Sequence, residues 1–477
     1  MTQELAGRIA AYLEGARPQI LADLKALAAI PSIEGEPAPG APFGPACARA
    51  LKTAAELFRR EGFETVVYEN DGYALAQAGD PTAEKVIGLF GHSDVVPVDE
   101  EDWIFTAPFE PIEKDGLLIG RGVNDNKSGI IAALYLSKMI RDLKLPFPAR
   151  LQTFIGSNEE TGMRDIDAFC RDHKAPDLSL VPDNAFPLMI GEKGTCAMWA
   201  VSPAAFKQIK SLEGGKAFNI ALARVTTVFT DNSLEAELRA RVEGDNRYRL
   251  ETTADGLTLT AIGVPKHSAS PQDSVNAAWL TAKLLLDCPS LCAGDRATIS
   301  VVSDLLSGYY GEVFGVVQAD PNFGKLTCVN GIAKTVDGKI RLLFDIRYGT
   351  ATDPATMLEK VKARVAAMGW TLEGVKNNPG YCLSADHPMI PVLLKAFRDH
   401  TGDPNANFRY SLGGTYARHL PNAFSIGTMV APKQPLPIAL PAGHGGAHQS
   451  DEVLRVNDYL EAIAITAHML LDSAEAL

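Results

Sequence analysis

Residues 85–98 read Lys-Val-Ile-Gly-Leu-Phe-Gly-His-Ser-Asp-Val-Val-Pro-Val, and the prediction of the fold class starts from this stretch. Its apolar run stops at Gly91, as a strand buried inside a sheet would. Apolar residues at helical spacing follow over residues 129–143, and a second strand-like run covers residues 151–155. Strand, helix and strand in this order predict an α/β domain whose sheet is mostly parallel and covered by helices.

The middle of the chain has a different pattern. Alternating segments such as 248–252, 257–262 and 339–347 are separated by helical stretches, which predicts an α+β domain with an antiparallel sheet. After about residue 385 the α/β character returns. We therefore expect one domain interrupted by another: residues 1–192 and 385–477 form the α/β domain, and residues 193–384 form the insert.

Composition narrows the class of protein and its setting. Apolar residues make up 46% of the 477-residue chain, enough for two or three domains with large cores. The net charge of −13 argues against a nucleic-acid or anionic-membrane partner, and no apolar run reaches the roughly 20 residues of a membrane span. The seven cysteines are scattered and odd in number, and the N-terminus lacks a signal-peptide pattern, so we expect a cytoplasmic protein with free thiols.

Five short segments of the predicted α/β parts end a strand-like stretch with acids or histidines. Open α/β sheets place ligand sites at the carboxyl ends of their strands, so these segments could converge on one site. They are Gly91–Asp94, Asn124–Asn126, Ser157–Glu160, Val181–Asp183 and Ala447–Gln449.

The donor atoms in these segments suit divalent metal ions. Imidazole and carboxylate groups bind zinc, and also manganese or cobalt. Five protein ligands are too many for one catalytic tetrahedral zinc with an open position, but they fit two ions if one carboxylate bridges both. Without cations the carboxylates, together with Asp94 and Glu159, would repel each other and take up protons. The candidate ligands are His92, Asp125, Glu160, Asp183 and His448.

Taken alone, each segment also has an ordinary interpretation. Glu159 and Glu160 could lie in a solvated loop, and Asp183 is a residue type that is common in turns. His448 could be a loop histidine, and the nearby His444 competes with it. Only the order and the joint setting of the segments favour a metal site.

The joint pattern resembles a known family. Residues 92–97 read His-Ser-Asp-Val-Val-Pro, and residues 120–129 read Gly-Arg-Gly-Val-Asn-Asp-Asn-Lys-Ser-Gly. With Trp103 between them, they closely resemble the di-zinc metallopeptidase family of aminoacylase, carboxypeptidase G and the bacterial dipeptidases. Glu159–Gly162, the Asp183 segment and Ala447–Glu452 continue the pattern in the family's order.

Two further segments look most like one branch of that family. Glu192–Gly194 and Gly413–Arg418 are similar to the dipeptidase V branch, the Xaa-His dipeptidase-like enzymes, which cleave unblocked dipeptides. The resemblance covers nearly the whole chain. It implies a zinc-peptidase fold, in which residues 193–384 form a lid domain over the catalytic domain.

The resemblance also implies a role for each candidate ligand. His92 and Asp183 would bind one metal ion, Glu160 and His448 the other, and Asp125 would bridge the two. The implied ions are two divalent cations, zinc in the first place, with manganese or cobalt as alternatives. The peptide bond that follows Asp125 is expected to be cis.

Two more acids would act beside the ligands. Asp94 would accept a hydrogen bond from the second ring nitrogen of His92 and so fix its tautomer. Glu159 would be the general base, which takes a proton from the water activated by two metal ions and returns it to the leaving amine.

The insert carries a second implied set of residues. Asn219 and His267 resemble the family residues that stabilise the tetrahedral intermediate, while Arg347 of the insert, together with Gly414 and Thr415 of the returning α/β part, would bind the substrate. A guanidinium group suits bidentate capture of a substrate carboxylate. Taken alone, Arg347 could equally form a surface salt bridge and His267 could be an ordinary loop histidine. Because Asn219, His267 and Arg347 lie on the lid, the site would be completed by domain closure, and the large insert favours a monomer.

These observations predict a metal-dependent dipeptidase that hydrolyses the peptide bond of short unblocked peptides. The alternative is an N-acyl amino acid deacylase or carboxypeptidase on the same di-metal site, which would be distinguished by a blocked amino end of the substrate. A third hypothesis is a catalytically inactive binding protein of this fold. The presence of every candidate ligand and of Glu159 argues against it.

Overall fold

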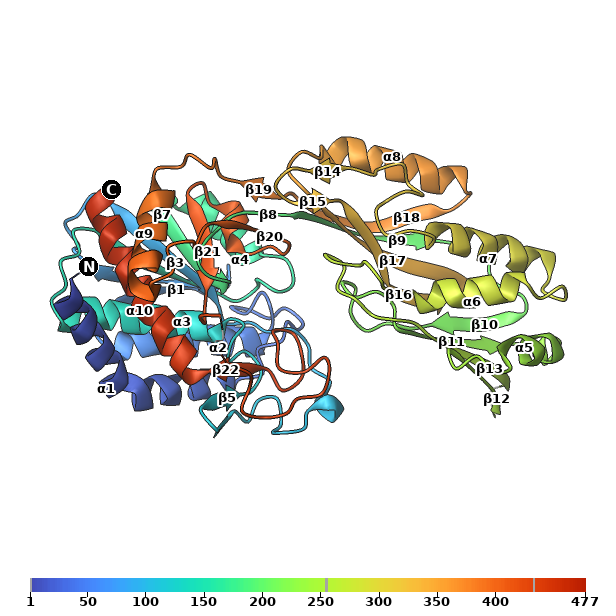
Figure 1. Ribbon diagram of the computed structural model, residues 1–477, viewed down its shortest axis with the longest axis horizontal. Helices are drawn as coiled ribbons and strands as arrows, with labels where there is room; N and C mark the ends of the chain where they lie inside the picture. Colours follow the sequence, from blue (N-terminus) through green and yellow to red (C-terminus); the bar gives the residue numbers. More distant parts are fainter. Residues whose placement is uncertain (1, 254–255, 432–433) are drawn as a thin grey trace. The chain divides into compact units, whose positions relative to one another are not determined.

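The computed structural model describes residues 2–253, 256–431 and 434–477. Two compact units make up the chain, whose course Figure 1 shows in colour. The first unit comprises the residues up to Gly191, Leu383–Ser411 and Thr415–Leu477, and the second unit comprises Glu192–Cys382 and Leu412–Gly414.

One mixed sheet forms the centre of the first unit. Its strand order is β1 (Glu64–Tyr68), β2 (Tyr73–Gly79), β6 (Arg150–Gly156), β3 (Val86–His92), β7 (Leu178–Asn184), β21 (Ala423–Gly427) and β8 (Met189–Glu192), with β20 (Arg409–Ser411) also beside β8. The four strands β6, β3, β7 and β21 are parallel, which confirms the predicted α/β class. The outer strands are antiparallel; a short turn joins β1 to β2, and such a connection allows only antiparallel pairing.

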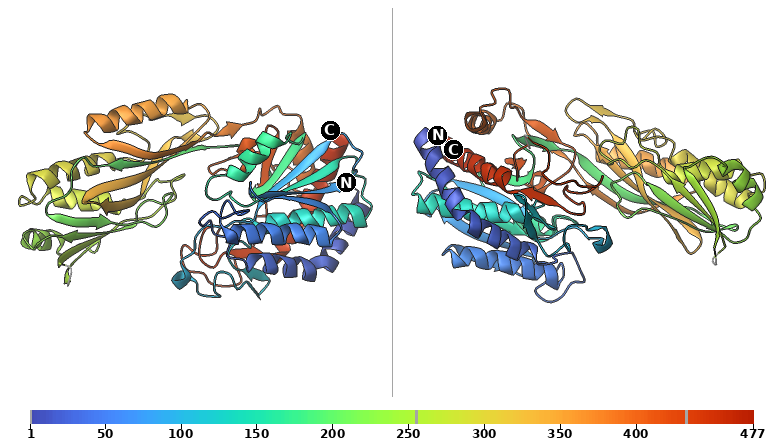
Figure 2. Two further views of the ribbon diagram at one scale, coloured as in Figure 1. Left: turned by 180° about the vertical axis from the view of Figure 1, so that it is seen from behind. Right: turned by 60° about the horizontal axis from the view of Figure 1, so that its bottom comes forward.

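Helices cover both faces of this sheet. Figure 2 shows α1 (Gln3–Ala28), α2 (Pro45–Arg60) and α3 (Lys127–Asp142) on one face and α4 (Arg164–Asp172) on the other. Helix α10 (Val456–Ala476) packs against α1, α3 and α9 (Met389–Thr401). Of the helices in the described part of the chain, none is both long enough and apolar enough to span a membrane.

A buried carboxylate ties three of these helices together. Asp23 of α1 accepts hydrogen bonds from the guanidinium group of Arg60 in α2, at 2.9 and 2.7 Å, and from the hydroxyl of Tyr135 in α3, at 2.8 Å. Burial alone would raise the pKa of Asp23, but the hydrogen bonds from Arg60, Gln19 and Tyr135 outweigh burial and hold this pKa below its ordinary value. The charged form of Asp23 is therefore the one that stabilises the helix layer.

Smaller elements complete the first unit. A three-stranded antiparallel sheet contains β22 (Val453–Arg455), β5 (Leu117–Ile119) and β4 (Ile112–Lys114). Two 3₁₀ helices, η1 (Glu100–Asp102) and η2 (Tyr416–His419), lie in the connecting segments.

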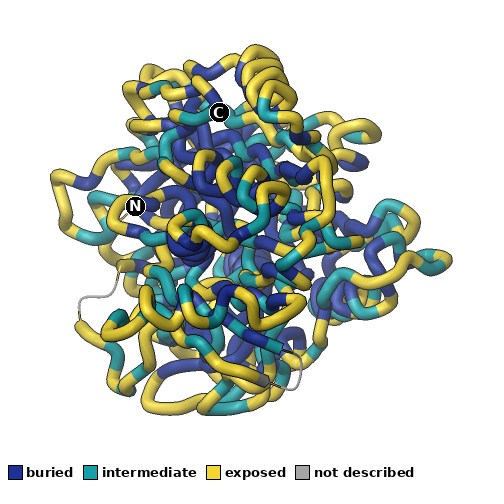
Figure 3. Tube along the Cα trace, turned by 90° about the vertical axis from the view of Figure 1, so that its right-hand side faces the viewer, coloured by how far each residue is buried: buried dark blue, intermediate teal, exposed yellow. Residues whose placement is uncertain are grey.

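The core of the first unit explains why the apolar residues of β3 form a buried strand. Ile87, Leu89 and Phe90 of β3 are all buried, because α3 covers the sheet on one side and an aromatic cluster packs on the other. In that cluster the ring of Phe154 lies 5.3–5.4 Å from the rings of Tyr73, Phe90, Phe169 and Tyr416, measured between ring centroids. Figure 3 shows how buried and exposed stretches alternate along the chain.

The second unit contains two four-stranded antiparallel sheets. The first has the order β10 (Ile209–Glu213), β11 (Arg224–Phe229), β13 (Gly256–Ile262) and β12 (Tyr248–Thr253). The second has the order β16 (Thr327–Val336), β17 (Lys339–Tyr348), β9 (Gly194–Val201) and β18 (Thr371–Asn378). The predicted α+β class is confirmed, with two larger sheets where the sequence suggested one.

Helices and short strands fill the rest of the second unit. Helices α6 (Ala277–Leu286) and α7 (Ala293–Leu305) pack against each other, and α8 (Pro354–Ala367) packs on β18. The remaining elements are α5 (Glu235–Val242), β14 (Ala319–Asp320), β15 (Gly324–Lys325) and β19 (Tyr381–Cys382).

The substitution Phe154→Ala should lower the free energy of unfolding of the first unit by about 3–5 kcal/mol, because a large buried ring is removed from a packed cluster. Urea denaturation followed by circular dichroism measures the change. Val66→Ala, at an exposed position of β1, serves as the control and should cost less than about 0.5 kcal/mol. Equal effects of the two substitutions would contradict the assignment of this cluster to the core.

Candidate metal centre

Three of the five candidate segments lie at the carboxyl ends of neighbouring parallel strands. His92 is the last residue of β3, Glu159 and Glu160 follow β6, and Asp183 lies near the end of β7. Because β3 pairs with both β6 and β7, these side chains share one edge of the sheet. This is the part of the site that strand order alone brings together.

The other two segments do not end strands of the main sheet, contrary to the prediction. Asp125 does not end a strand of the main sheet, since it lies in the loop between β5 and α3, just before the helix. His448 lies in the long loop between β21 and β22, with a left-handed φ of 62°. The Asp125–Asn126 peptide bond is cis, as the resemblance implies.

The carboxylate of Asp125 lies between two histidines. Its Oδ1 atom is 3.3 Å from Nε2 of His92, and its Oδ2 atom is 3.1 Å from Nε2 of His448. Nε2 of His92 is also 3.6 Å from Oδ2 of Asp183, and Nε2 of His448 is 3.0 Å from Oε2 of Glu160. The two oxygens of Asp125 thus belong to two different sets of donor atoms.

Adjacent glutamates lie on different sides of this arrangement. Oε2 of Glu159 is 4.0 Å from Nε2 of His92, on the side of Asp183, whereas Glu160 contacts His448. Two groups of possible ligands meet the distance requirement for a metal ion: His92 with Asp125 and Glu160, and His92 with Glu159 and Asp183. Glu159 is 8% exposed, so it is buried but still borders solvent.

The donor atoms fit divalent cations. Nε2 of His92 and Oε1 of Glu160 are buried, and within the described residues neither makes a hydrogen bond, although buried polar atoms normally have partners. Burial, followed by the charges of the neighbouring acids, raises the pKa of Glu160 and Asp183, and it raises that of Glu159 although His92 opposes the shift. Cations among these oxygens would offset the repulsion between the acids.

Two carboxylates outside this set fix the loop that carries Glu159 and Glu160. Four consecutive backbone N–H groups, those of residues 157–160, donate hydrogen bonds to carboxylate oxygens. Ser157 and Asn158 donate to Oδ2 of Asp165 at 2.7 and 2.9 Å, and the next two residues donate to Asp94 at 3.2 and 3.1 Å. The backbone around the paired glutamates is therefore held at every residue.

Asp94 has a second contact, with His92. Nδ1 of His92 lies 3.1 Å from the main-chain oxygen of Asp94 and 3.5 Å from its carboxylate oxygen Oδ1. The main-chain oxygen is thus the nearer acceptor for this ring nitrogen, and the carboxylate is used mainly by the loop that follows β6.

Tyr416 anchors Asp165 from the opposite side. Its hydroxyl donates a hydrogen bond of 2.5 Å to Oδ2 of Asp165, and both residues are fully buried. Burial, and then the charge of Asp94, raises the pKa of Asp165 to about 6, although the hydrogen bonds lower it. A Cβ atom at Gly156 would lie 1.9 Å from this hydroxyl, so only glycine fits there.

Glu452 fixes the loop that carries Asp125. Its carboxylate accepts hydrogen bonds from the backbone N–H groups of Gly122, Asn124 and Asp125 at 2.8–3.0 Å. It also forms a buried ion pair of 2.7 Å with Arg121. Glu452 lies four residues after His448 in the chain, so one segment supplies a candidate ligand and the support for another.

The second unit contains Asn219, His267 and Arg347, and it brings the first two together. Nδ2 of Asn219 lies 3.5 Å from Nε2 of His267. Nδ1 of His267 accepts a hydrogen bond of 3.2 Å from the N–H of Ala269. Arg347 lies in β17, where its Nε donates to Asp345 at 2.8 Å.

Gly414 and Thr415 lie where the chain passes from the second unit to the first. Gly414 is half-buried, while Thr415 is buried and its hydroxyl accepts the N–H of Ala417, which caps η2. Their contact with a substrate stays a prediction.

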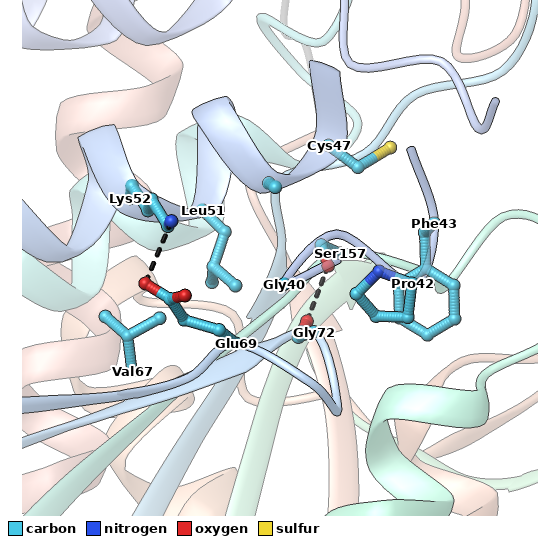
Figure 4. Close-up of a pocket in the computed structure, with 11 residues that line it drawn as sticks. Gly40, Pro42, Phe43, Cys47, Leu51, Lys52, Val67, Glu69, Gly72 and Ser157 are labelled. Atoms are coloured by element: carbon cyan, nitrogen blue, oxygen red, sulfur yellow. Dashed lines mark hydrogen bonds and ion pairs between the residues drawn. The ribbon is translucent and has the colours of Figure 1, made fainter. Parts of the chain in front are cut away.

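A separate narrow hollow lies beside α2 and the end of β1 (Figure 4). An ion pair of 2.9 Å between Lys52 and Glu69 crosses one side of it, and Ser157 donates a hydrogen bond of 2.5 Å to the main-chain oxygen of Gly72 on another. Cys47 also lines it, but its thiol has a pKa raised to about 12 by burial. The charged groups here neutralise each other, so we assign no chemistry to this hollow.

Comparison with known proteins shows which family this chain belongs to. The family model described as peptidase family M20/M25/M40 matches residues 88–472, which include every candidate ligand. The chain belongs to peptidase family M20/M25/M40. It is therefore a hydrolase of the metallopeptidase type, and the family resemblance seen in the sequence is confirmed.

Individual relatives cover nearly the whole chain of this M20 peptidase. The protein named "Putative dipeptidase" from Staphylococcus epidermidis is 27% identical over 466 residues, covering 94% of this chain and 95% of its own. "Putative dipeptidase YtjP" from Bacillus subtilis is 27% identical over 450 residues, covering 92% and 93%.

Solved structures share the fold. Human carnosine dipeptidase 1 superposes with a TM-score of 0.63 at 16% identity, with 99% of each chain covered. The di-peptidase Dug1p from Saccharomyces cerevisiae also gives a TM-score of 0.63, at 14% identity and with 99% of each chain covered. At these identities the similarity describes the fold of the M20 peptidase alone.

Sequence reasoning missed the residues that hold the loops in this M20 peptidase. Asp165, Tyr416 and Asn126 were not singled out, although Asn126 donates to the main-chain oxygen of Pro182 at 2.5 Å and to Oδ1 of Asp183 at 3.0 Å. Tyr416 and Asn126 stand inside quoted motifs, which is the one signal that could have drawn attention to them. Asp165 has no such signal, because an aspartate in the first turn of a helix is common.

Asp165→Ala should lower the free energy of unfolding of the M20 peptidase by at least about 3 kcal/mol, since four buried donors lose their acceptor at about 1–3 kcal/mol each. It should also reduce the metal retained after gel filtration. Urea denaturation and elemental analysis measure the two effects. Asp167→Ala on the same helix is the matched control, because the Asp167 side chain is 62% exposed and its ion pair among the described residues is with His419, an interaction worth about 1 kcal/mol or less.

Proposed function

We propose that this protein is a metal-dependent dipeptidase that hydrolyses the peptide bond of short unblocked peptides. The observation that carries the proposal is the carboxylate of Asp125, whose two oxygens lie 3.3 and 3.1 Å from the ring nitrogens of two different histidines. A carboxylate placed in this way suits two cations held side by side. The names of the most similar relatives support a dipeptide substrate.

The contacts support the ligand sets that the family resemblance implies. His92 and Asp183 would hold one divalent cation, His448 and Glu160 the other, with Asp125 shared. We assign zinc in the first place, since imidazole and carboxylate ligands suit it, while manganese and cobalt bind the same groups. When bound, such a pair lowers the pKa of water and polarises the scissile carbonyl group.

Glu159 is proposed as the general base. Its carboxylate lies on the side of His92 and Asp183, it makes no direct bond to His448, and its loop is fixed through the N–H groups that Asp94 and Asp165 accept. Burial is the largest cause that raises its pKa well above the usual value, and burial does not depend on a bound cation. A base with a raised pKa can take a proton from the attacking water and return it to the leaving amine near neutral pH.

The second unit is proposed to contact the substrate. Because Nδ1 of His267 accepts the N–H of Ala269, the neutral ring carries its hydrogen on Nε2, where it could donate to the oxyanion that develops during attack. Nδ2 of Asn219, 3.5 Å from this nitrogen, is a second donor that could bind the same oxyanion. Arg347 would bind the carboxylate at the end of a dipeptide.

The cellular setting is part of the proposal. All seven cysteines lie in the described residues and none forms a disulfide, which suits a reducing cytoplasm. We propose that the protein acts as a monomer, because its insert is large enough to supply Asn219, His267 and Arg347 from the same chain.

Glu159→Gln keeps the shape of the side chain but removes the base, so kcat for a dipeptide should fall by at least about a hundredfold. The bound metal should stay at the wild-type level, because Glu159 is not proposed as a ligand. Initial-rate kinetics and elemental analysis test both statements. The exposed Glu101→Gln provides a control, and a variant that keeps its kcat would exclude Glu159 as the base.

Removal of metal provides a second test. After treatment with a chelator the protein should lose activity on dipeptides, and addition of zinc, manganese or cobalt should restore it to different extents. A panel that contains free dipeptides and N-acetyl amino acids should show hydrolysis of the former. Hydrolysis of the N-acetyl compounds alone would favour a deacylase, and activity indifferent to chelation would contradict a metal-dependent enzyme.

A further inference from the structure

A buried carboxylate in the second unit joins two segments that carry proposed substrate contacts. Asp345 of β17 is 0% exposed. Its Oδ2 atom accepts a hydrogen bond of 2.5 Å from the hydroxyl of Ser268 and one of 2.8 Å from Nε of Arg347. One oxygen atom thus holds the residue that follows His267 and the guanidinium group of Arg347.

The surrounding backbone makes this junction rigid. β17 is paired on both sides, with β16 and with β9, through the whole segment that contains Asp345 and Arg347. On the other side of the junction, the N–H of Ser268 donates to the main-chain oxygen of Asn219 at 2.8 Å. The strand, the His267 segment and the Asn219 turn are therefore connected through two hydrogen bonds of Ser268.

The contacts of Arg347 leave one side of its guanidinium group available. The residue is 7% exposed, and within the described residues its recorded polar partner is Asp345, bonded through Nε. The two terminal amino groups remain, and together they form a fork that matches the two oxygens of a carboxylate. A second cation lies close, since the charge of Arg347, after burial, lowers the pKa of Lys193.

We infer that Asp345 is a positioning residue that sets the distance between the His267 segment and Arg347, and thereby selects substrates of dipeptide length. The inference rests on the proposed function. In a dipeptide a single residue separates the scissile carbonyl group from the terminal carboxylate, whereas in a tripeptide two residues do. Because one oxygen of Asp345 holds both segments, neither segment can shift without breaking a buried hydrogen bond.

Two variants break the junction at different points. Ser268→Ala removes the bond to the His267 segment and leaves the Asp345–Arg347 pair intact. Asp345→Asn removes the charge that orients Arg347. Ser270→Ala is the matched control, because Ser270 lies in the same loop, is exposed, and has no side-chain hydrogen bond within the described part of the chain. Ser268→Ala keeps the inference testable if Asp345→Asn does not fold.

The substrates are a dipeptide, the same dipeptide with a C-terminal amide, and a tripeptide with the same first two residues. The wild type should prefer the dipeptide over the other two. In both variants KM for the dipeptide should rise by about tenfold or more, the loss expected for a charge-assisted hydrogen bond. The kcat/KM values for the amide and the tripeptide should change by less than about threefold, so the preference for the dipeptide should fall.

Two results would overturn the inference, and they differ in whether the proposed function is affected as well. If kcat/KM falls equally for all three substrates, Asp345 serves the stability of the second unit and not the selection of length, while the proposed dipeptidase function stands. If the wild type hydrolyses the dipeptide and its amide equally well, Arg347 does not bind the substrate carboxylate. That result would overturn the carboxylate role in the proposed function together with the inference.

Discussion

Negative charge buried at one edge of the main sheet is the constraint on which the first unit depends. Asp125, Glu159, Glu160 and Asp183 lie within a few ångströms of two imidazole rings, in a region that excludes most water. Carboxylates packed in this way raise each other's pKa unless cations lie between them. The donor chemistry of the cluster and its unpartnered atoms at His92 and Glu160 both follow from this single requirement.

A second layer of acids keeps that cluster in shape without belonging to it. Asp94, Asp165 and Glu452 accept hydrogen bonds from seven backbone N–H groups in the loops that carry Asp125, Glu159 and Glu160. Backbone N–H groups of loops are otherwise satisfied by water, and here they are satisfied by fixed side chains. The loops can therefore hold several like charges close together and still keep one conformation.

The second unit uses the same device on a smaller scale. A buried aspartate, Asp345, receives a hydroxyl from one segment and a guanidinium group from another. In both units the residues proposed to touch the substrate or the metal ions are thus supported by carboxylates that do neither. Substitution of such a support leaves a buried donor without a partner, which costs more than the net worth of the hydrogen bond itself.

The family, the α/β and α+β classes and the helices and strands named in the sequence analysis could be predicted, because motif residues, apolar periodicity and turn residues act locally. The run before Gly91 is a strand, and residues 127–142 form a helix, almost as the pattern predicts. The candidate ligands were also found in this way, since their motifs lie in short segments. The antiparallel outer strands of the first unit, and the division of the second unit's antiparallel strands into two larger sheets, were not predicted, because pairing joins segments that are distant in sequence.

The contacts that hold the loops of both units could be seen only in the tertiary structure. Asp165 meets Tyr416 across 251 residues, Glu452 meets Arg121 across 331, and Ser268 meets Asp345 across 77. No local pattern marks such pairs, because each partner taken alone is an ordinary polar residue. They acquire their role when folding removes them from water, which makes an acceptor of the right shape necessary for every buried donor.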